Sequence, residues 1–478
     1  MLARFSTVFG LSNSQAGLDF VDIDISTDTP LYVCPYAIQI RDDEWSAEAG
    51  DHIRSFFSEV LNALQVDDDE RAMHLLLNLH EPNETFLGES EGEPRGRAIG
   101  PKKARKLADA IKSSRAYETG LLADVSEAAL YIHGVGRDTV SDLATNVIRG
   151  ILAEYTKAEC EIHGVPMQFV TDIGPVWDVV RRDWVAEPLE LPIIAGRPIL
   201  LVPKTCVRYK LSLDSQEFYN HHMIEFLKAE YAAAGGALVR MLKDGTPKVT
   251  KKSVKERHPL IKDDLAAFII EHPDVLQQYK SLKGAEGPLS IGELEHFFDE
   301  PAFAMALQNK LEGIPSGNKD ANAYHSLVMG ILTFLFHPDL RHPIKEHEIY
   351  QGRKRIDIKY TNAATRGFFF RMLEAPQTRA ISIVVECKNY SNDVANEAFD
   401  QLAGRFGHRR GFLGLLVSRS YDDRTRAIDR CKDAAADSGR YMLAFEDADL
   451  VALLQLVAAG HRPRIDRFMQ DRFDEICG

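Results

Sequence analysis

The sequence predicts an α/β protein with a C-terminal αβββαβ core and a separate, mixed α/β N-terminal region. At 478 residues the chain is longer than one hydrophobic core usually organises. Its 45% hydrophobic and 27% charged residues are typical of globular proteins. In the last third of the chain, helical and strand periodicities alternate. We expect an N-terminal region over 1–284, with a division into two subdomains near 165–190 as one option, a linker over 285–317, and a C-terminal domain over 318–478.

The elements of the C-terminal domain follow from these periodicities. Apolar residues recur at helical spacing from Ala321 to Phe336, where His337-Pro338 ends the pattern. Short apolar runs bounded by turn residues predict strands. The predicted order is a helix at 321–336, strands at 344–350, 355–360 and 380–385, a helix at 393–406 and a strand at 411–417.

The triplet Glu386-Cys387-Lys388 follows the most apolar of these strands. Because side chains alternate along a strand, Glu386 and Lys388 share one face and Cys387 turns to the core. The strand at 355–360 brings Asp357 to the same region. Two carboxylates suit Mg²⁺, which binds few protein oxygens and keeps waters or phosphate oxygens. A surface ion pair is the alternative for an isolated acid-x-lysine triplet.

These residues resemble the PD-(D/E)XK nuclease superfamily, and within it the Mrr-type restriction endonucleases. Asp357 matches the PD position, Glu386 and Lys388 match the (D/E)XK element, and Gln401 matches the glutamine of the following helix. The resemblance covers residues 318–454, under a third of the chain. It implies a restriction-endonuclease-like core in which Asp357, Glu386, Lys388 and Gln401 are catalytic, Asp357 and Glu386 bind Mg²⁺, and Mn²⁺ can substitute.

The sequence departs from the family pattern in its first helix, which often supplies another acid. The helix at 321–336 contains none, and its polar candidates are Asn322 and His325. Glu346 and Glu348, on the next strand, are the nearest replacements. They share a face, and we favour Glu346 as a third metal ligand. A solvated hairpin is the alternative for both.

Charge is unevenly distributed. The net charge of the chain is −14, yet residues 341–440 hold 19 Lys and Arg against 13 Asp and Glu, a local net charge of +6. Nucleic acids bind to local basic surface. The candidate phosphate contacts are Arg353, Lys354, Arg355, Arg405, Arg409 and Arg410. About half of these six residues are expected only to solvate the surface.

The N-terminal region carries weaker signals. The run from Leu18 to Ile25 alternates acidic and apolar residues, which predicts a half-exposed strand with a solvated acidic face. A second metal site on its three aspartates is the alternative. Segments 98–107 and 134–143 resemble helix-hairpin-helix modules that bind DNA backbones, although ordinary helix starts are the preferred interpretation.

Several classes of protein are disfavoured. Apolar runs are too short for a membrane helix, and no signal peptide opens the chain, so we expect a cytoplasmic protein without a membrane partner. The six cysteines are scattered, which argues against a zinc module or a disulfide framework. No nucleotide-binding signature is present, so ATP-driven cleavage would need a second subunit, for example of a defence system.

The sequence therefore predicts a metal-dependent deoxyribonuclease that hydrolyses DNA phosphodiester bonds. The resemblance implies a role in bacterial restriction or antiviral (antiphage) defence, with residues 1–284 as a recognition or regulatory region. Cutting two strands favours a homo-oligomer. Two alternatives stay open: a non-catalytic protein that binds nucleic acid or assembles on the same fold, and a DNA repair or junction-resolving nuclease.

Overall fold

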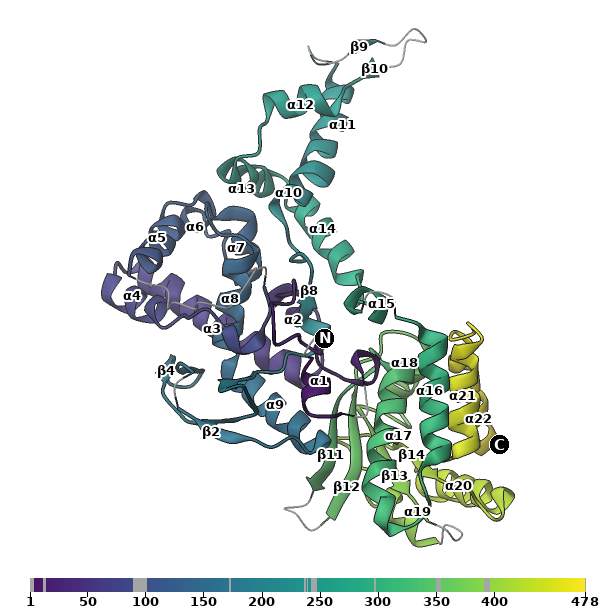
Figure 1. Cartoon of the computed structure of the whole chain (residues 1–478). Coiled ribbons are helices and arrows are strands. Elements are labelled where there is room, and N and C mark those ends of the chain that lie inside the picture. The colour runs from purple at the N-terminus through teal and green to yellow at the C-terminus, as the bar shows by residue number, and fades with distance from the viewer. Residues whose placement is uncertain are drawn as a thin grey trace.

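The computed structural model describes residues 4–11, 14–88, 101–171, 173–235, 238, 240–241, 247–295, 298–349, 354–390 and 396–477. It is a mixed α/β structure, as predicted. Figure 1 shows three parts: a largely helical N-terminal region, a sheet flanked by helices near the C-terminus, and a helical arm that stands away from both. No helix in the described ranges has the length and apolar character needed to cross a membrane.

The C-terminal part is built on one five-stranded sheet. Its strands lie side by side in chain order: β11 (Leu340–Ile349), β12 (Lys354–Asn362), β13 (Ser382–Lys388), β14 (Leu413–Ser418) and β15 (Tyr441–Glu446). The first three strands are antiparallel, and β13, β14 and β15 are parallel. The buried pattern of β13 and β14 agrees with their continuous apolar sequences, as expected for strands covered on both faces.

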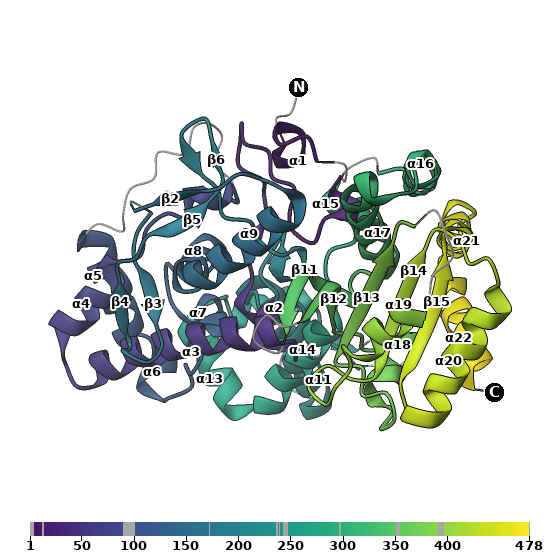
Figure 2. The same ribbon diagram turned by 90° about the horizontal axis from the view of Figure 1, so that it is seen from below.

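Helices cover both faces of this sheet (Figure 2). One layer contains α16 (Glu300–Gly313), α17 (Ala321–Phe336) and α21 (Asp447–Ala458). The other contains α18 (Gly367–Glu374), α19 (Asn396–Ala403), α20 (Arg424–Ser438) and α22 (Arg464–Cys477). The helix predicted at 321–336 is α17, and the one predicted at 393–406 corresponds to α19, which ends at Ala403. α16 lies within the expected linker, yet it packs on α21 and buries Leu307 and Leu311.

The N-terminal region is mainly helical rather than evenly α/β. Its helices are α1 (Phe5–Val8), α2 (Pro35–Gln39), α3 (Glu44–Gln65), α4 (Asp69–Leu77), α5 (Pro101–Lys112), α6 (Arg115–Glu118), α7 (Val125–Tyr131), α8 (Arg137–Val147) and α9 (Arg149–His163). Its strands are short and form two-stranded ladders: β1 (Tyr32–Val33) with β8 (Val207–Arg208), β2 (Gln168–Val170) with β5 (Leu189–Leu191), β3 (Val176–Asp178) with β4 (Asp183–Val185), and β6 (Ile193–Ile194) with β7 (Arg197–Pro198).

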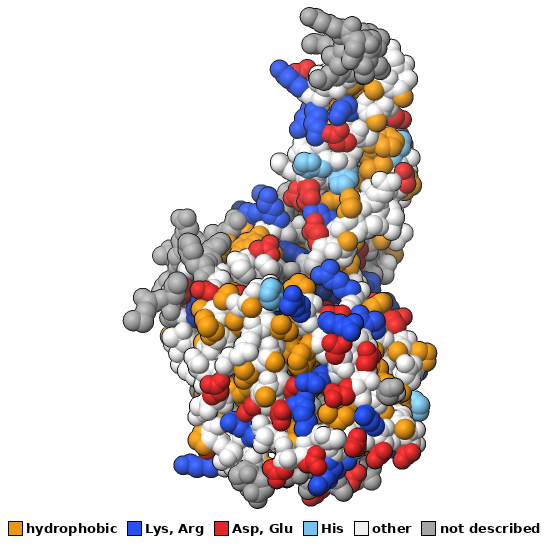
Figure 3. Space-filling view, turned by 90° about the vertical axis from the view of Figure 1, so that its right-hand side faces the viewer, with side chains coloured by type: hydrophobic (Ala, Val, Ile, Leu, Met, Phe, Trp, Pro, Cys, Tyr) orange, Lys and Arg blue, Asp and Glu red, His pale blue; other side chains and the backbone are white. Residues whose placement is uncertain are grey.

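The arm follows this region. It contains α10 (Ser215–Phe218), a π-helical turn (Tyr219–Met223), α11 (Ile224–Ala234), the ladder of β9 (Arg240–Met241) and β10 (Pro247–Lys248), α12 (Lys251–Arg257), α13 (Lys262–Glu271) and α14 (Pro273–Ala285). α15 (Ile291–Leu294) then leads back to the sheet. Figure 3 shows the arm rising above a face on which basic and acidic side chains are interspersed.

The prediction of a half-exposed strand at Leu18–Ile25 is wrong. This segment forms no strand, and Asp19, Asp22 and Asp24 are all buried. Asp22 accepts hydrogen bonds from the backbone and hydroxyl of Ser6, and Asp19 accepts one from Tyr155. The alternation in the sequence therefore reflects buried carboxylates with partners rather than a solvated face.

Asp19 and another buried acid, Asp43, join the N-terminal region to the sheet. His342, at the start of β11, places Nδ1 3.3 Å from Asp19 and Nε2 3.4 Å from Asp43. Arg341 forms a second ion pair with Asp43, at 3.1 Å. His342 lies at a β-bulge with a φ of 48°, which redirects its side chain away from the sheet. We call Arg341, His342, Asp19 and Asp43 the interdomain clasp.

Candidate active site

The predicted carboxylates lie on neighbouring strands. β12 and β13 pair through Ile358 and Val385, so the next residues, Asp357 and Glu386, lie beside each other where the ladder ends. The Asp357 carboxylate accepts a hydrogen bond of 2.9 Å from the Cys387 backbone N–H. This bond holds the two strands together at the point where backbone pairing stops.

Lys388 links the two strands to α19. Its Nζ donates to Glu386 Oε1 at 2.8 Å and to Gln401 Oε1 at 3.0 Å. Gln401 in turn donates to Glu397, one turn earlier in α19, at 3.3 Å. Lysine has three donors, so two bonds orient the ammonium and leave one N–H for another acceptor. The structure thus brings Asp357, Glu386, Lys388 and Gln401 together.

Glu386 is the most constrained of these groups. Its side chain is 2% exposed, and Oε2 has no hydrogen-bond partner among the described residues. Burial raises the pKa of Glu386, repulsion from Asp357 raises it further, and attraction to Lys388 offsets only part of this. For Lys388, burial alone would lower the pKa, but the charge of Glu386 and the hydrogen bond to it raise the pKa above the ordinary value.

This donor set fits a hard divalent cation. Two neighbouring carboxylates share one lysine, and the buried Glu386 Oε2 is an oxygen without a partner, which a cation would satisfy. Across the described residues, no group of three or more acidic, His or Cys side chains is arranged to hold a metal ion. Mg²⁺ needs only one or two carboxylates when waters and phosphate oxygens complete its shell.

The proposed third ligand lies on β11. The neighbours of Glu346, Lys345 and His347, pair with Ile358 and Ile356 on either side of Asp357. The side chains of Glu346 and Glu348 lie outside the described residues, so their part in the site stays a prediction.

Two further residues belong to this end of the sheet. His325 of α17 hydrogen-bonds the Cys387 backbone and lies near Asp357 and Lys388; burial lowers its pKa, and attraction to Asp357 offsets this only in part. Asn389 is buried and donates to the carbonyls of Pro315 and Gly317, at 3.1 and 2.9 Å. The sequence marked His325 only as a polar residue on the helix, and it held no signal for Asn389.

The predicted phosphate contacts are only partly described. Arg405 lies close enough to Glu386 to stabilise its carboxylate, which connects it to the site. Arg409 is exposed, and half-buried Arg410 donates to the Arg405 carbonyl at 2.6 Å. Arg353 and the side chains of Lys354 and Arg355 lie outside the described residues. Their contact with nucleic acid stays a prediction.

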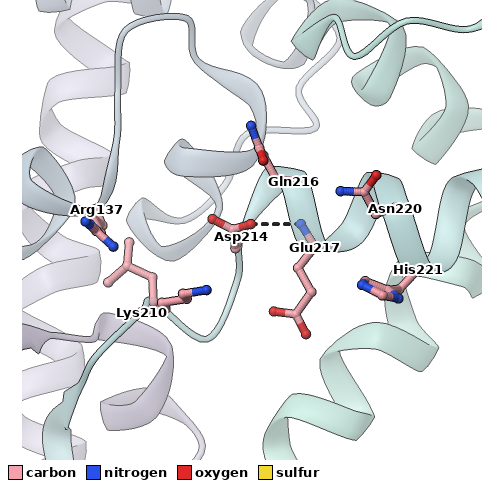
Figure 4. Close-up of a pocket in the computed structure, with 8 residues that line it drawn as sticks. Arg137, Lys210, Asp214, Gln216, Glu217, Asn220 and His221 are labelled. Atoms are coloured by element: carbon pink, nitrogen blue, oxygen red, sulfur yellow. Dashed lines mark hydrogen bonds between the residues drawn. The ribbon is translucent and has the colours of Figure 1, made fainter. Parts of the chain in front are cut away.

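A cavity elsewhere in the chain is unrelated to these residues. It has a volume of about 610 Å³ and lies between the start of α8 and the base of the arm. Figure 4 shows its polar lining, in which Asp214 caps α10 by accepting the Glu217 backbone N–H at 2.8 Å. None of the predicted catalytic residues lines it.

In comparisons with known proteins, a family model matches part of the chain. No curated protein sequence matches it. The solved structure of restriction endonuclease FokI aligns over 92% of this chain and 80% of its own, with 10% identity and a TM-score of 0.26. That score is too low to support an inference on fold or function. Residues 10–214 match the family described as a domain of unknown function (DUF8370).

Proposed function

We propose that this protein is a Mg²⁺-dependent deoxyribonuclease, with its active centre at the end of β13. The observation that carries the proposal is Lys388, held by Glu386 and Gln401 beside a second carboxylate, Asp357. A surface ion pair does not account for this arrangement, because Glu386 and Lys388 are 2% and 12% exposed.

Each of these residues has a separate role in the proposed phosphodiester hydrolysis. Asp357 and Glu386 would hold Mg²⁺, which when bound lowers the pKa of water and stabilises developing negative charge. Lys388 has a free N–H with which to orient the attacking water, and Gln401 limits the rotation of the ammonium group. His325 and the Asn389 anchor keep this end of β13 in place.

The wider role rests on the resemblance to PD-(D/E)XK nucleases of the Mrr type. It supports endonucleolytic cleavage in bacterial restriction or antiphage defence, by a homo-oligomer or with a second subunit. The proposal extends to control of the nuclease by the N-terminal region. The interdomain clasp joins that region to β11, and β11 is the strand that borders Asp357.

A cleavage assay tests the proposal. Supercoiled, linear, branched and single-stranded DNA are incubated with the full chain, with Mg²⁺, Mn²⁺ or EDTA. We expect cleavage that requires the metal and falls at least about 100-fold in Lys388→Met, because a positioned group typically contributes 10²–10⁴-fold. The matched control is Lys432→Met, an exposed lysine of α20. Equal cleavage by Lys388→Met and the parent would refute the proposal, and preference for branched DNA would favour a junction-resolving enzyme.

A further inference from the structure

The outer face of α5 carries a row of basic side chains. Lys102, Lys103, Arg105 and Lys106 are all exposed. Ala104, Ala108 and Ile111, on the opposite face of the helix, are buried. At 3.6 residues per turn the four cations fall within an arc of about 160°. α5 lies at the end of the N-terminal region farthest from the sheet (Figure 1).

Within the described ranges, none of these four cations forms an ion pair. The charge of Lys103 acts on Asp142 across the neighbouring cavity. Lys112, on the same helix, instead bonds to Asp67 and Asp69 at 2.9 and 3.0 Å. Like charges three or four residues apart in a helix repel. In a chain of net charge −14, this concentration of positive charge on one helix face suits a polyanion.

A glycine-containing turn and a cavity lie next to α5. A cavity of about 410 Å³ is lined by Lys103 and Lys106 on one side and by the turn between α7 and α8 on the other. Gly134 has a φ of 75°, and no heavy atom lies within 4 Å of a Cβ built on it or on Gly136. Gly136 is the N-cap of α8 and makes no side-chain capping hydrogen bond.

Nearby acids oppose an anion at this surface. Asp142 lines the same cavity. Burial, followed by repulsion from Glu81 and Asp138, raises its pKa to about 7, and Lys103 offsets part of this. Replacing Asp142 by a neutral residue should therefore strengthen the binding of an anion, whereas removing the lysines should weaken it.

We propose that α5 and the α7–α8 turn bind the phosphate backbone of duplex DNA, and that residues 10–214 thereby hold the DNA for the nuclease part. A row of exposed cations contacts phosphates and does not read bases. Lys102 and Lys106 are four residues apart, about 6 Å along the helix axis. One strand of a duplex carries a charge every ~3.4 Å of its axis, so it can present a phosphate to each lysine. The choice of duplex DNA rests on the proposed function.

Binding is measured without cleavage. The full chain in EDTA is titrated into a fluorescent duplex of random sequence, and anisotropy is followed from low to high salt. Lys102→Ala/Lys106→Ala is compared with Lys432→Ala/Arg467→Ala, which removes the same charge from α20 and α22. Those two residues form ion pairs with Asp429 and Asp471. Hydrogen exchange of α5 with and without the duplex gives a second readout.

We expect the α5 variant to bind at least about fivefold more weakly at physiological salt, with a salt slope shallower by about 2, since each lost phosphate contact removes close to one unit. The control should match the parent, Asp142→Asn should bind more tightly, and DNA should protect α5 amides. Unchanged affinity in the α5 variant, an equal loss in the control, or an equal lysine dependence for duplex RNA would each overturn the inference.

The two proposals fail independently. A chain that binds duplex DNA through α5 but cleaves no DNA with any metal would refute the nuclease and leave this surface standing. A chain that cleaves DNA in a Lys388-dependent manner, but whose affinity for duplex DNA does not depend on the α5 lysines, would refute the DNA-binding surface and leave the nuclease standing.

Discussion

Replacing His342 by Gln removes the central cation of the interdomain clasp, and its cost should depend on pH. His342 is 9% exposed and lies between the carboxylates of Asp19 and Asp43. Burial alone would lower the pKa of His342, but the hydrogen bonds and charges of these two acids raise it to about 9. The ring is therefore charged in the folded protein at neutral pH.

The magnitude follows from this pKa. The shift from an ordinary value of 6.5 to about 9 corresponds to about 3 kcal/mol, at about 1.4 kcal/mol per pH unit. Because the folded pKa is the higher one, this stabilisation is complete below pH 6.5 and is lost as the pH rises through 9. The carboxylates of Asp19 and Asp43 act in the opposite sense, because their pKa values are lowered in the folded protein. The stabilisation that they contribute is complete above the usual pKa range of a carboxylic acid and is lost on acidification.

Other titrating groups lie around the clasp. Asp19 interacts electrostatically with Lys204, His337, Glu159 and Tyr155, and Asp43 interacts with Arg341. All of them are present in both the parent and His342→Gln. The pH-dependent difference in unfolding free energy between the two proteins therefore reports the loss of the His342 charge together with the pKa changes that this loss causes in Asp19 and Asp43.

Urea unfolding at pH 6, 7, 8 and 9 measures this difference. Fluorescence is a suitable probe, since Trp45 stacks on the His342 ring with centroids 5.5 Å apart. We expect His342→Gln to be about 3 kcal/mol less stable at pH 6, within the cost of breaking a buried ion pair, and nearly equal to the parent above pH 9. Parallel stability curves across this range would refute the argument, because they would show that His342 is neutral in the folded state.

Three further predictions concern the sheet and its active end. Gln401→Leu should lower kcat about tenfold with little change in KM, because the Lys388 ammonium keeps Glu386 but loses its second anchor; an unchanged kcat in steady-state cleavage assays would contradict this. Asn389→Ala should cost about 1–3 kcal/mol in urea unfolding, since the Pro315 and Gly317 carbonyls lose their donor, and Asn389→Asp should not restore it. Gly411→Ala should destabilise the protein by at least about 2 kcal/mol, because Gly411 has a φ of 96° and an added Cβ would overlap the Arg379 carbonyl and lie 2.7 Å from Ala380 Cα; Gly292→Ala, at an open position, is the control for thermal unfolding.

Local periodicity determined much of the C-terminal part. The helix at Ala321–Phe336 was predicted to the residue, because eleven of its residues are buried and most of these have apolar side chains. β13 and β14 were recognised for the same reason. The alternation of side chains along a strand placed Glu386 and Lys388 on one face, and the structure shows them hydrogen-bonded to each other.

Tertiary structure alone decided which distant residues meet. Asp43 and Arg341 are 298 positions apart, and Asn389 and Pro315 are 74 apart, yet the members of each pair are hydrogen-bonded to each other. No periodicity encodes such contacts, because they depend on how whole elements dock. The same reason explains the error at Leu18–Ile25, where alternating aspartates suggested solvent, but docked neighbours supply Ser6, Tyr155 and His342 as partners. Sequence periodicity shows which face of an element is polar, and only the packed structure shows whether that face meets water or another part of the chain.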